Sequence, residues 1–188
     1  MSAEATSDER AGILLVDDME DNLIALEAVL GPLNEPLVRA RSGEEAMKAL
    51  LRQRFALVLL DVRMPGMDGF ETAANIKRLD QTKDVPIIFL TGAEDDPGYT
   101  FRGYATGAAD YVTKPFDPWV LRAKVTVFLD LYRKNRQLER LLSREHVHSR
   151  ELSTQLAALE DQLSDDTPPD LTALRAQVHE IRRLIGKG

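Results

Sequence analysis

Five polar side chains stand at the ends of four short apolar runs in this 188-residue sequence. They are Asp17 and Asp18 after ILLV, Asp61 after ALVLL, Thr91 after VPIIFL, and Lys114 after ADYVT. Three carboxylates held within a few ångströms would raise one another's pKa values unless a cation neutralised them. Oxygen ligands favour Mg²⁺ or Mn²⁺ as that cation, and Mg²⁺ held by carboxylates commonly bridges to a phosphoryl group. The residues therefore point to metal-assisted phosphoryl chemistry.

Each member of this set has a chemical role and a simpler structural interpretation. An aspartate can act as a nucleophile by forming an acyl phosphate. The Lys114 amine can stabilise the phosphoryl oxygens, and the Thr91 hydroxyl can bond a remaining oxygen. The structural interpretation makes Asp18 a helix cap, Thr91 a turn hydroxyl and Lys114 a surface charge. Only the joint placement of the residues favours the chemical interpretation.

The polar residues share a location only if the apolar runs form one sheet. Short apolar runs alternate with helical patterns through the first 130 residues, which predicts βα units and a parallel sheet. The first, third and fourth runs are unbroken, so we expect helices on both faces of the sheet. Ligands of such sheets bind at the carboxyl ends of the strands, where the polar residues stand. The predicted strands are Ile13–Asp17, Pro36–Ala40, Ala56–Asp61, Val85–Thr91 and Ala109–Thr113.

Four helical segments are expected between the strands, near residues 21–30, 42–53, 70–79 and 99–105. Ser42 with Glu45 three residues later has the pattern of a capping box at the start of the second segment. Gly31 and Gly107 follow the first and last segments, where a left-handed glycine commonly ends a helix. Start and stop signals thus agree with the alternation of strands and helices.

One long helical pattern replaces this alternation after Asp117. From Leu131, alternating spacings of four and three residues form a heptad seam of mostly leucine, which predicts a coiled coil. Asn135 is a polar residue on this seam and can select a parallel dimer. The seam consists of Leu131, Asn135, Leu138, Leu142, Glu145, Ser149, Leu152, Leu156, Leu159 and Leu163. Off the seam, and interpreted as its solvated face, are Arg133, Lys134, Arg136, Arg140, Arg144 and Arg150.

The segment SDDTPPD, residues 164–170, interrupts the long helix, and its threonine and prolines predict a new helix start. The short second helix continues an apolar seam through Leu171, Leu174, Val178, Ile181 and Ile185. This helix can fold back on the long helix as a hairpin or pair with another chain. The sequence leaves both arrangements open.

In their order along the chain, the motifs resemble the receiver domain of two-component response regulators over about residues 12–130. The resemblance implies a doubly wound, flavodoxin-like α/β fold with a five-stranded parallel sheet of order 2-1-3-4-5. It implies that Asp61 is the phosphoacceptor and that Lys114 and Thr91 contact the phosphoryl group. The implied ligands of the metal are Asp17, Asp18, Asp61 and the backbone carbonyl of Arg63. The resemblance rests on Asp17-Asp18, Asp61-Val62-Arg63-Met64-Pro65-Gly66-Met67-Asp68-Gly69, Thr91-Gly92 and Lys114-Pro115-Phe116.

The same resemblance implies how a signal leaves the site. Thr91 would move toward the phosphoryl group and free space for Tyr111, three residues before Lys114, to turn inward. Because the last receiver helix is continuous with the coil, we expect phosphorylation to change the pairing or docking of residues 118–163. The resemblance implies a sensor histidine kinase or phosphotransfer protein as a partner. The predicted coil adds a second copy of the chain and an effector protein that the sequence does not name.

The sequence is expected to divide into five parts. These are a lead-in over residues 1–11, the receiver domain over 12–130, the coiled coil over 131–163, a linker over 164–170 and a short helix over 171–188. No apolar run approaches the roughly 20 residues that span a bilayer, and the start lacks a signal-peptide pattern, so a cytoplasmic protein without a membrane partner is expected.

Composition and charge exclude further classes. The chain has no cysteine, which excludes disulfides, cysteine-ligated metal sites and thiol nucleophiles. Residues 1–130 hold 14 basic and 22 acidic side chains, a charge of −8 within the net −7 of the chain, so a nucleic-acid partner is not expected.

Two alternatives come from other functional classes. A receiver-like scaffold that no longer accepts phosphate would only oligomerise through the coil, but Asp61, Thr91 and Lys114 are all present. A hydrolase of the haloacid dehalogenase type needs a second aspartate two residues after its nucleophile, and Arg63 occupies that position. We therefore expect a switch that assists its own phosphorylation and dephosphorylation rather than a turnover enzyme.

Overall fold

A computed structural model describes residues 12–92, 107–164 and 171–185. The chain divides into two compact units, Met1–Lys134 and Asn135–Gly188. The helical segment expected near residues 99–105, the interruption at 165–170 and the lead-in at 1–11 lie outside the described residues.

The first unit is built on a five-stranded sheet of order β2-β1-β3-β4-β5, as the resemblance implies. All neighbouring strands are parallel. The strands are β1 Gly12–Val16, β2 Leu37–Ala40, β3 Phe55–Asp61, β4 Ile87–Gly92 and β5 Asp110–Lys114. Every residue of β1 and β3 is buried, and so are the first five residues of β4. The unbroken apolar runs therefore lie between two helical layers, as predicted.

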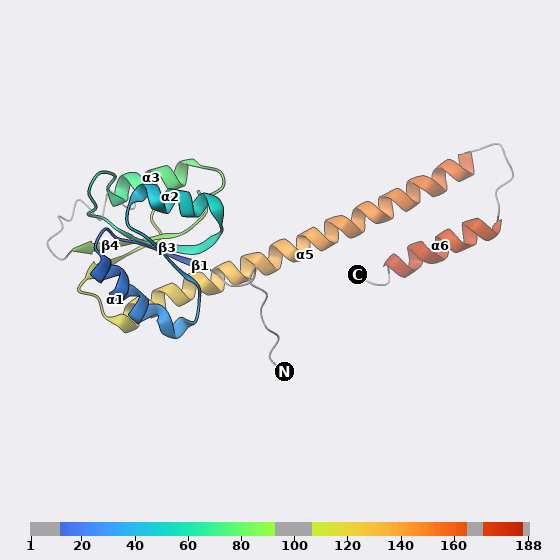
Figure 1. Ribbon diagram of the computed structural model, residues 1–188. Helices are drawn as coiled ribbons and strands as arrows, with labels where there is room; N and C mark the ends of the chain where they lie inside the picture. Colours follow the sequence, from blue (N-terminus) through green and yellow to red (C-terminus); the bar gives the residue numbers. More distant parts are fainter. Residues whose placement is uncertain (1–11, 93–106, 165–170, 186–188) are drawn as a thin grey trace. The chain divides into compact units, whose positions relative to one another are not determined.

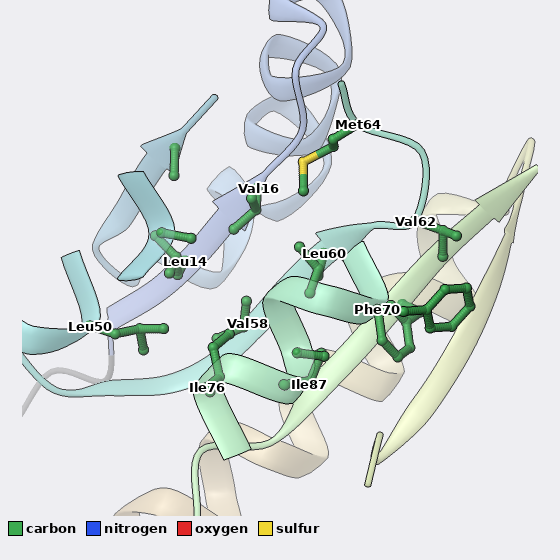
Figure 2. Packing of buried hydrophobic residues seen from close by; sticks show 14 of the residues in the cluster. Leu14, Val16, Leu50, Val58, Leu60, Val62, Met64, Phe70, Ile76 and Ile87 are labelled. Atoms are coloured by element: carbon green, nitrogen blue, oxygen red, sulfur yellow. The ribbon is translucent and has the colours of Figure 1, made fainter. Parts of the chain in front are cut away.

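Helices cover both faces of the sheet, as Figure 1 shows. On one face lie α1 Glu20–Leu30 and the first turns of α5, which bury Leu23, Leu26, Leu121 and Leu129 against the sheet. On the other face lie α2 Gly43–Arg52 and α3 Gly69–Arg78. In this second layer, Figure 2 shows Leu50, Phe70 and Ile76 of the helices beside Leu14, Val58, Leu60 and Ile87 of the strands.

Side chains cap the starts of α2 and α3, and the cap of α2 is the predicted capping box. The Ser42 hydroxyl accepts a hydrogen bond from the Glu45 backbone N–H at 3.2 Å, and the Glu45 carboxylate accepts one from the Arg41 N–H at 2.8 Å. The Asp68 carboxylate caps α3 by accepting from the Glu71 N–H at 2.8 Å. These bonds satisfy N–H groups that the first turn of a helix leaves without partners.

The prediction of a left-handed Gly31 at the end of α1 is wrong. Gly31 has φ −48° and ψ −41°, which is right-handed, because a 3₁₀ turn over Gly31–Leu33 continues directly from α1. Asn34 takes the left-handed conformation instead, with φ 54°, and its N–H donates to the Gly31 carbonyl. Gly107 does have the expected positive φ, at 86°.

The C-terminal region is helical, as predicted. Helix α5 runs from Pro118 to Ser164 without a break, and α6 spans Leu171–Ile185. About half of the surface of each of four seam leucines is exposed, namely Leu131, Leu138, Leu142 and Leu156. Among the described helices, none is long and apolar enough to cross a membrane.

Candidate functional site

The Lys114 amine joins the ends of three strands at one edge of the sheet. Lys114 is the last residue of β5, and its Nζ lies 2.7 Å from Asp17 Oδ2 and 2.6 Å from Asp61 Oδ1. Asp61 ends β3, and Asp17 follows β1 directly. Because the strands are parallel, their carboxyl ends meet at this edge. The structure thus brings together residues that are 53 and 97 positions apart.

Asp17 is fully buried and its carboxylate is held by four contacts. Its Oδ1 accepts from the Met19 N–H and from Asn22 Nδ2, both at 2.9 Å. Its Oδ2 accepts from Asn22 Nδ2 at 3.0 Å and from Lys114. A buried carboxylate is stable only when donors of this kind replace water. Both oxygens of Asp17 are therefore already engaged, and the side chain is fixed in orientation.

Asp61 is 7% exposed and less fully engaged than Asp17. Its Oδ1 accepts from Lys114, and its Oδ2 accepts from the Arg63 backbone N–H at 3.0 Å. Each carboxylate oxygen offers about two lone-pair sites. One site on each oxygen therefore remains for a metal ion or for nucleophilic attack.

Charge and burial act in opposite directions on the two ionisable groups at the centre. Burial raises the pKa of Asp61, and the Asp17 charge raises it further, which outweighs the lowering effect of Lys114. Burial alone would lower the pKa of the Lys114 amine, but the hydrogen bonds and charges of Asp17 and Asp61 raise that pKa above its usual range. Lys114 is therefore held as a cation, and the carboxylates still carry more negative charge than it neutralises.

The residues fit a divalent cation with oxygen ligands. One carboxylate oxygen from each of Asp17, Asp18 and Asp61 lies within 4.8 Å of the others. Asp18 is half-buried, so its carboxylate faces the site and solvent, and Asp61 has lone pairs left. Mg²⁺ is commonly held by one or two carboxylates and keeps several waters. We expect Asp18 and Asp61 to bind the metal ion directly. Asp17 would bind it through a water molecule, or directly after one of the hydrogen bonds that it now accepts is broken.

The two residues expected to carry a switch lie on the neighbouring strands. Thr91 is 9% exposed and directly follows Leu90, which pairs with Asp61 between β3 and β4. Tyr111 of β5 is half-buried, and its ring stacks on Phe89 with the centroids 5.4 Å apart. Thr91 thus lies beside the acceptor strand, with Tyr111 on the next strand.

Sequence patterns missed Asn22 as a contributor to this site and did not give the physical reason for Gly69. Asn22, in the first turn of α1, orients Asp17, but an asparagine near a helix start carries no signal for that contact. A Cβ atom on Gly69 would lie 2.2 Å from the Asp61 carbonyl oxygen and 2.8 Å from Val62 Cα. The pair Asp68-Gly69 is expected from the sequence to shape the loop and the helix start after Asp61, and the structure shows the reason at Gly69, where α3 starts against the acceptor strand. The cap interpretation of Asp18 is wrong, because Met19 is the N-cap residue of α1.

Comparison with known proteins agrees with this geometry. Residues 13–126 match the response regulator receiver domain family. Transcriptional regulatory protein AfsQ1 of Streptomyces coelicolor is 41% identical over 117 residues, which are 62% of this chain and 50% of AfsQ1. Response regulator PleD of Caulobacter vibrioides is 39% identical over 115 residues, 61% of this chain and 25% of PleD. The match thus spans half or less of these relatives.

Solved structures give the same result for the fold. A putative response regulator from Chloroflexus aurantiacus is 34% identical, with a TM-score of 0.60, and the match covers 64% of this chain and 98% of that protein. Chemotaxis protein CheY4 of Vibrio cholerae is 30% identical, with a TM-score of 0.59, over 63% of this chain and 98% of that protein. The chain therefore belongs to the response regulator receiver domain family, with the receiver domain in its N-terminal two thirds.

Proposed function

We propose that this chain is a phosphorylation-dependent switch in which Asp61 accepts a phosphoryl group and α5 carries the signal onward. Receiver domains of this family interact with histidine kinases or phosphotransfer proteins and are generally not enzymes. The proposed donor of the phosphoryl group is a phosphohistidine of a cytoplasmic histidine kinase or phosphotransfer protein. The observation that carries the proposal is the Lys114 amine held between Asp17 and Asp61, beside a third carboxylate.

The proposed transfer forms one bond and breaks one. An Asp61 carboxylate oxygen attacks phosphorus, the bond from phosphorus to the donor nitrogen breaks, and its electron pair stays on the imidazole, which takes up a proton. The product is an acyl phosphate on Asp61. Lys114, already positioned at Asp61, pairs with a phosphoryl oxygen, and the Thr91 hydroxyl donates to another.

Mg²⁺ or Mn²⁺ would neutralise charge on the phosphoryl oxygens. Asp18, Asp61 and the backbone carbonyl of Arg63 would hold the ion, and Asp17 would support them. Burial of Asp17 and Asp61 keeps both carboxylates in place before the donor arrives. Because the groups are positioned in advance, little reorganisation accompanies transfer.

The proposed switch uses the residues next to the acceptor strand. A phosphoryl group favours a second conformation only if it bonds better there. Movement of Thr91 toward the phosphoryl group would change the space available to the Tyr111 ring, which now packs beside Phe89. Strand β5 leads into α5, so a change at Tyr111 has a short path to the α5 surface.

The proposed output is the helical region that follows the receiver domain, acting through pairing with a second copy and recognition by an effector protein. Leucines along α5 are half exposed in a single chain, which leaves an apolar seam for a partner helix. A scaffold that does not accept phosphate is the second candidate. The fixed geometry of Asp17, Asp61 and Lys114 favours the switch, because a scaffold does not need these charges at one point.

Incubation with acetyl phosphate and Mg²⁺, followed by intact mass measurement, tests the acceptor. The native chain should gain one phosphoryl group, and Asp61→Asn should gain none. Asp68→Asn is the matched control, because Asp68 lies in the same loop and asparagine caps a helix equally well. The absence of an adduct on the native chain would leave the scaffold as the better account, whereas an adduct on Asp61→Asn would show that another residue is the acceptor.

A further inference from the structure

Burial along the far part of α5 shows where another segment of the same chain packs. Between residues 137 and 158 every side chain is exposed except His148, Leu152 and Gln155, which are half-buried. Their spacing of four and three residues places them on one face of the helix. On an isolated helix side chains shield only their neighbours three and four residues away, so a continuous half-buried stripe among exposed residues indicates a neighbouring segment. Part of the chain therefore covers this face.

Helix α6 can supply this cover, because it belongs to the same compact unit, residues 135–188, and its Ile181 is only 9% exposed. Residues 165–170 can span about 20 Å, whereas packed helices lie about 8–10 Å apart. The linker is therefore long enough for α5 and α6 to pack as an antiparallel hairpin. In such a hairpin Ile181 would lie opposite the helical turn of α5 that contains Leu152 and Gln155.

Charge favours the same arrangement. The last turns of α5, residues 151–164, contain Glu151, Glu160 and Asp161 and no basic residue. Helix α6 contains three arginines, Arg175, Arg182 and Arg183, against one acidic residue, Glu180. Antiparallel packing places the basic helix against the acidic one, which favours this pairing.

The hairpin leaves two apolar side chains uncovered. Leu156 of α5 is 51% exposed and Val178 of α6 is 43% exposed. Leu156 is 18 residues after Leu138, which is five helical turns, so both lie on the face of the leucine seam. The α6 hairpin therefore covers the edge of the seam at Leu152 and leaves the seam at Leu156 open.

We propose that a second copy of this chain covers Leu156 and Val178, so that the α5 ends and α6 helices of two copies form a four-helix bundle. This rests on the proposed pairing of α5 with a second copy. Charge complementarity favours a second copy as the occupant. Lys134 and Glu139 flank the seam five residues apart, the spacing at which a parallel, in-register pair places each lysine opposite the other chain's glutamate.

The two copies then share one apolar core. In the bundle, each α6 fills the groove beside the paired α5 seams, as in four-helix bundles built from helical hairpins. The polar seam positions Asn135, Glu145 and Ser149 weaken the α5 pair on its own. Helix α6 therefore supplies a substantial part of the apolar contact that holds the copies together.

Sedimentation equilibrium of the full chain tests the bundle with three variants. Val178→Asp should raise the dimer dissociation constant about tenfold or more, because a buried valine becomes a charge. Ala176→Asp is the matched control, since Ala176 is exposed about half a turn away from Val178, and it should leave the constant unchanged. Leu138→Asp should dissociate the α5 pair itself. Circular dichroism checks that each variant keeps its helices. If Val178→Asp loses helix, the milder replacement Val178→Ser is used in its place.

The outcomes separate the bundle from the pairing on which it rests. A native chain that is monomeric at all concentrations overturns both. A dimer that Leu138→Asp dissociates but Val178→Asp leaves unchanged keeps the α5 pairing and overturns the bundle. A dimer tightened by Val178→Asp also overturns the bundle, because α6 would then compete with the second copy.

Discussion

The start of α3 approaches the end of β3 so closely that a side chain at Gly69 has no room. A Cβ atom there would lie 2.2 Å from the Asp61 carbonyl oxygen, 2.8 Å from Val62 Cα and 3.0 Å from the Asp61 carbonyl carbon. All three neighbours are backbone atoms, so no side chain can rotate away. The Gly69 N–H also donates to the Val62 carbonyl at 3.0 Å, which holds the two segments together. Gly69→Ala must therefore displace the backbone that carries Asp61.

The size of the displacement sets the expected effect. Ordinary van der Waals contact begins near 3.4 Å, so the two segments must separate by about 1 Å. Overpacking of this kind costs about 1–3 kcal/mol of folding free energy. A misplacement of about 1 Å at reacting groups can cost about a hundredfold in rate. We expect the rate of phosphorylation by acetyl phosphate to fall between about tenfold and a hundredfold.

Urea unfolding and the time course of adduct formation by intact mass measure the two effects. Gly66→Ala is the control, because Gly66 lies in the same loop with φ 76° and has no atom within 4 Å of its Cβ position. Its left-handed conformation costs alanine about 1–2 kcal/mol, without pressing on the acceptor strand. Gly66→Ala should lose stability but keep its phosphorylation rate. If Gly69→Ala were as stable as the native chain and phosphorylated equally fast, the close approach would not position Asp61.

Two further predictions concern α1. Asn22→Ala removes the amide that contacts both oxygens of buried Asp17. The free energy of unfolding, measured in urea, should fall by about 1–3 kcal/mol, and adduct formation should be slower. An unchanged unfolding midpoint would contradict the role of Asn22 in holding Asp17. A hydrogen bond from Arg39 lowers the pKa of Glu27, and this effect outweighs the raising effect of burial. The pair therefore stabilises the folded state at pH values above the unfolded pKa of Glu27. This stabilisation is lost as the pH falls through the lower pKa of the folded state. The stability difference between the native chain and Arg39→Gln should therefore be largest at neutral pH and vanish in acid, whereas a difference independent of pH would mean that Arg39 acts only through packing.

Patterns along the sequence are sufficient to predict the sheet, because strands that are buried on both faces consist of unbroken apolar residues. The runs ILLV and ALVLL have no polar alternation, and the strands that contain them are completely buried. Polar residues at the ends of these runs then converge by topology, which is why Asp17, Asp61 and Lys114 could be placed together before any distance was known.

Other features depend on contacts that sequence spacing does not encode. The left-handed conformation of Asn34 in place of Gly31 follows from a short 3₁₀ turn that extends α1. The role of Asn22 depends on a tertiary contact with Asp17. The choice between hairpin and intermolecular pairing for α6 stays open in the sequence, because its apolar seam suits either partner. The burial of Ile181 and the half-buried face of His148, Leu152 and Gln155 are the observations that support the hairpin.

Phosphoryl transfer to Asp61 and its effect on α5 are measured most directly in one sample. The native chain and Asp61→Asn, each with Mg²⁺ and acetyl phosphate or beryllofluoride, are analysed by intact mass and by sedimentation. A phosphoryl adduct that is lost in Asp61→Asn, together with a beryllofluoride-dependent change in the dimer dissociation constant of the native chain alone, is the expected result. No adduct on the native chain, or an adduct and a sedimentation change that persist in Asp61→Asn, would contradict the assignment of Asp61 as the acceptor of a switch.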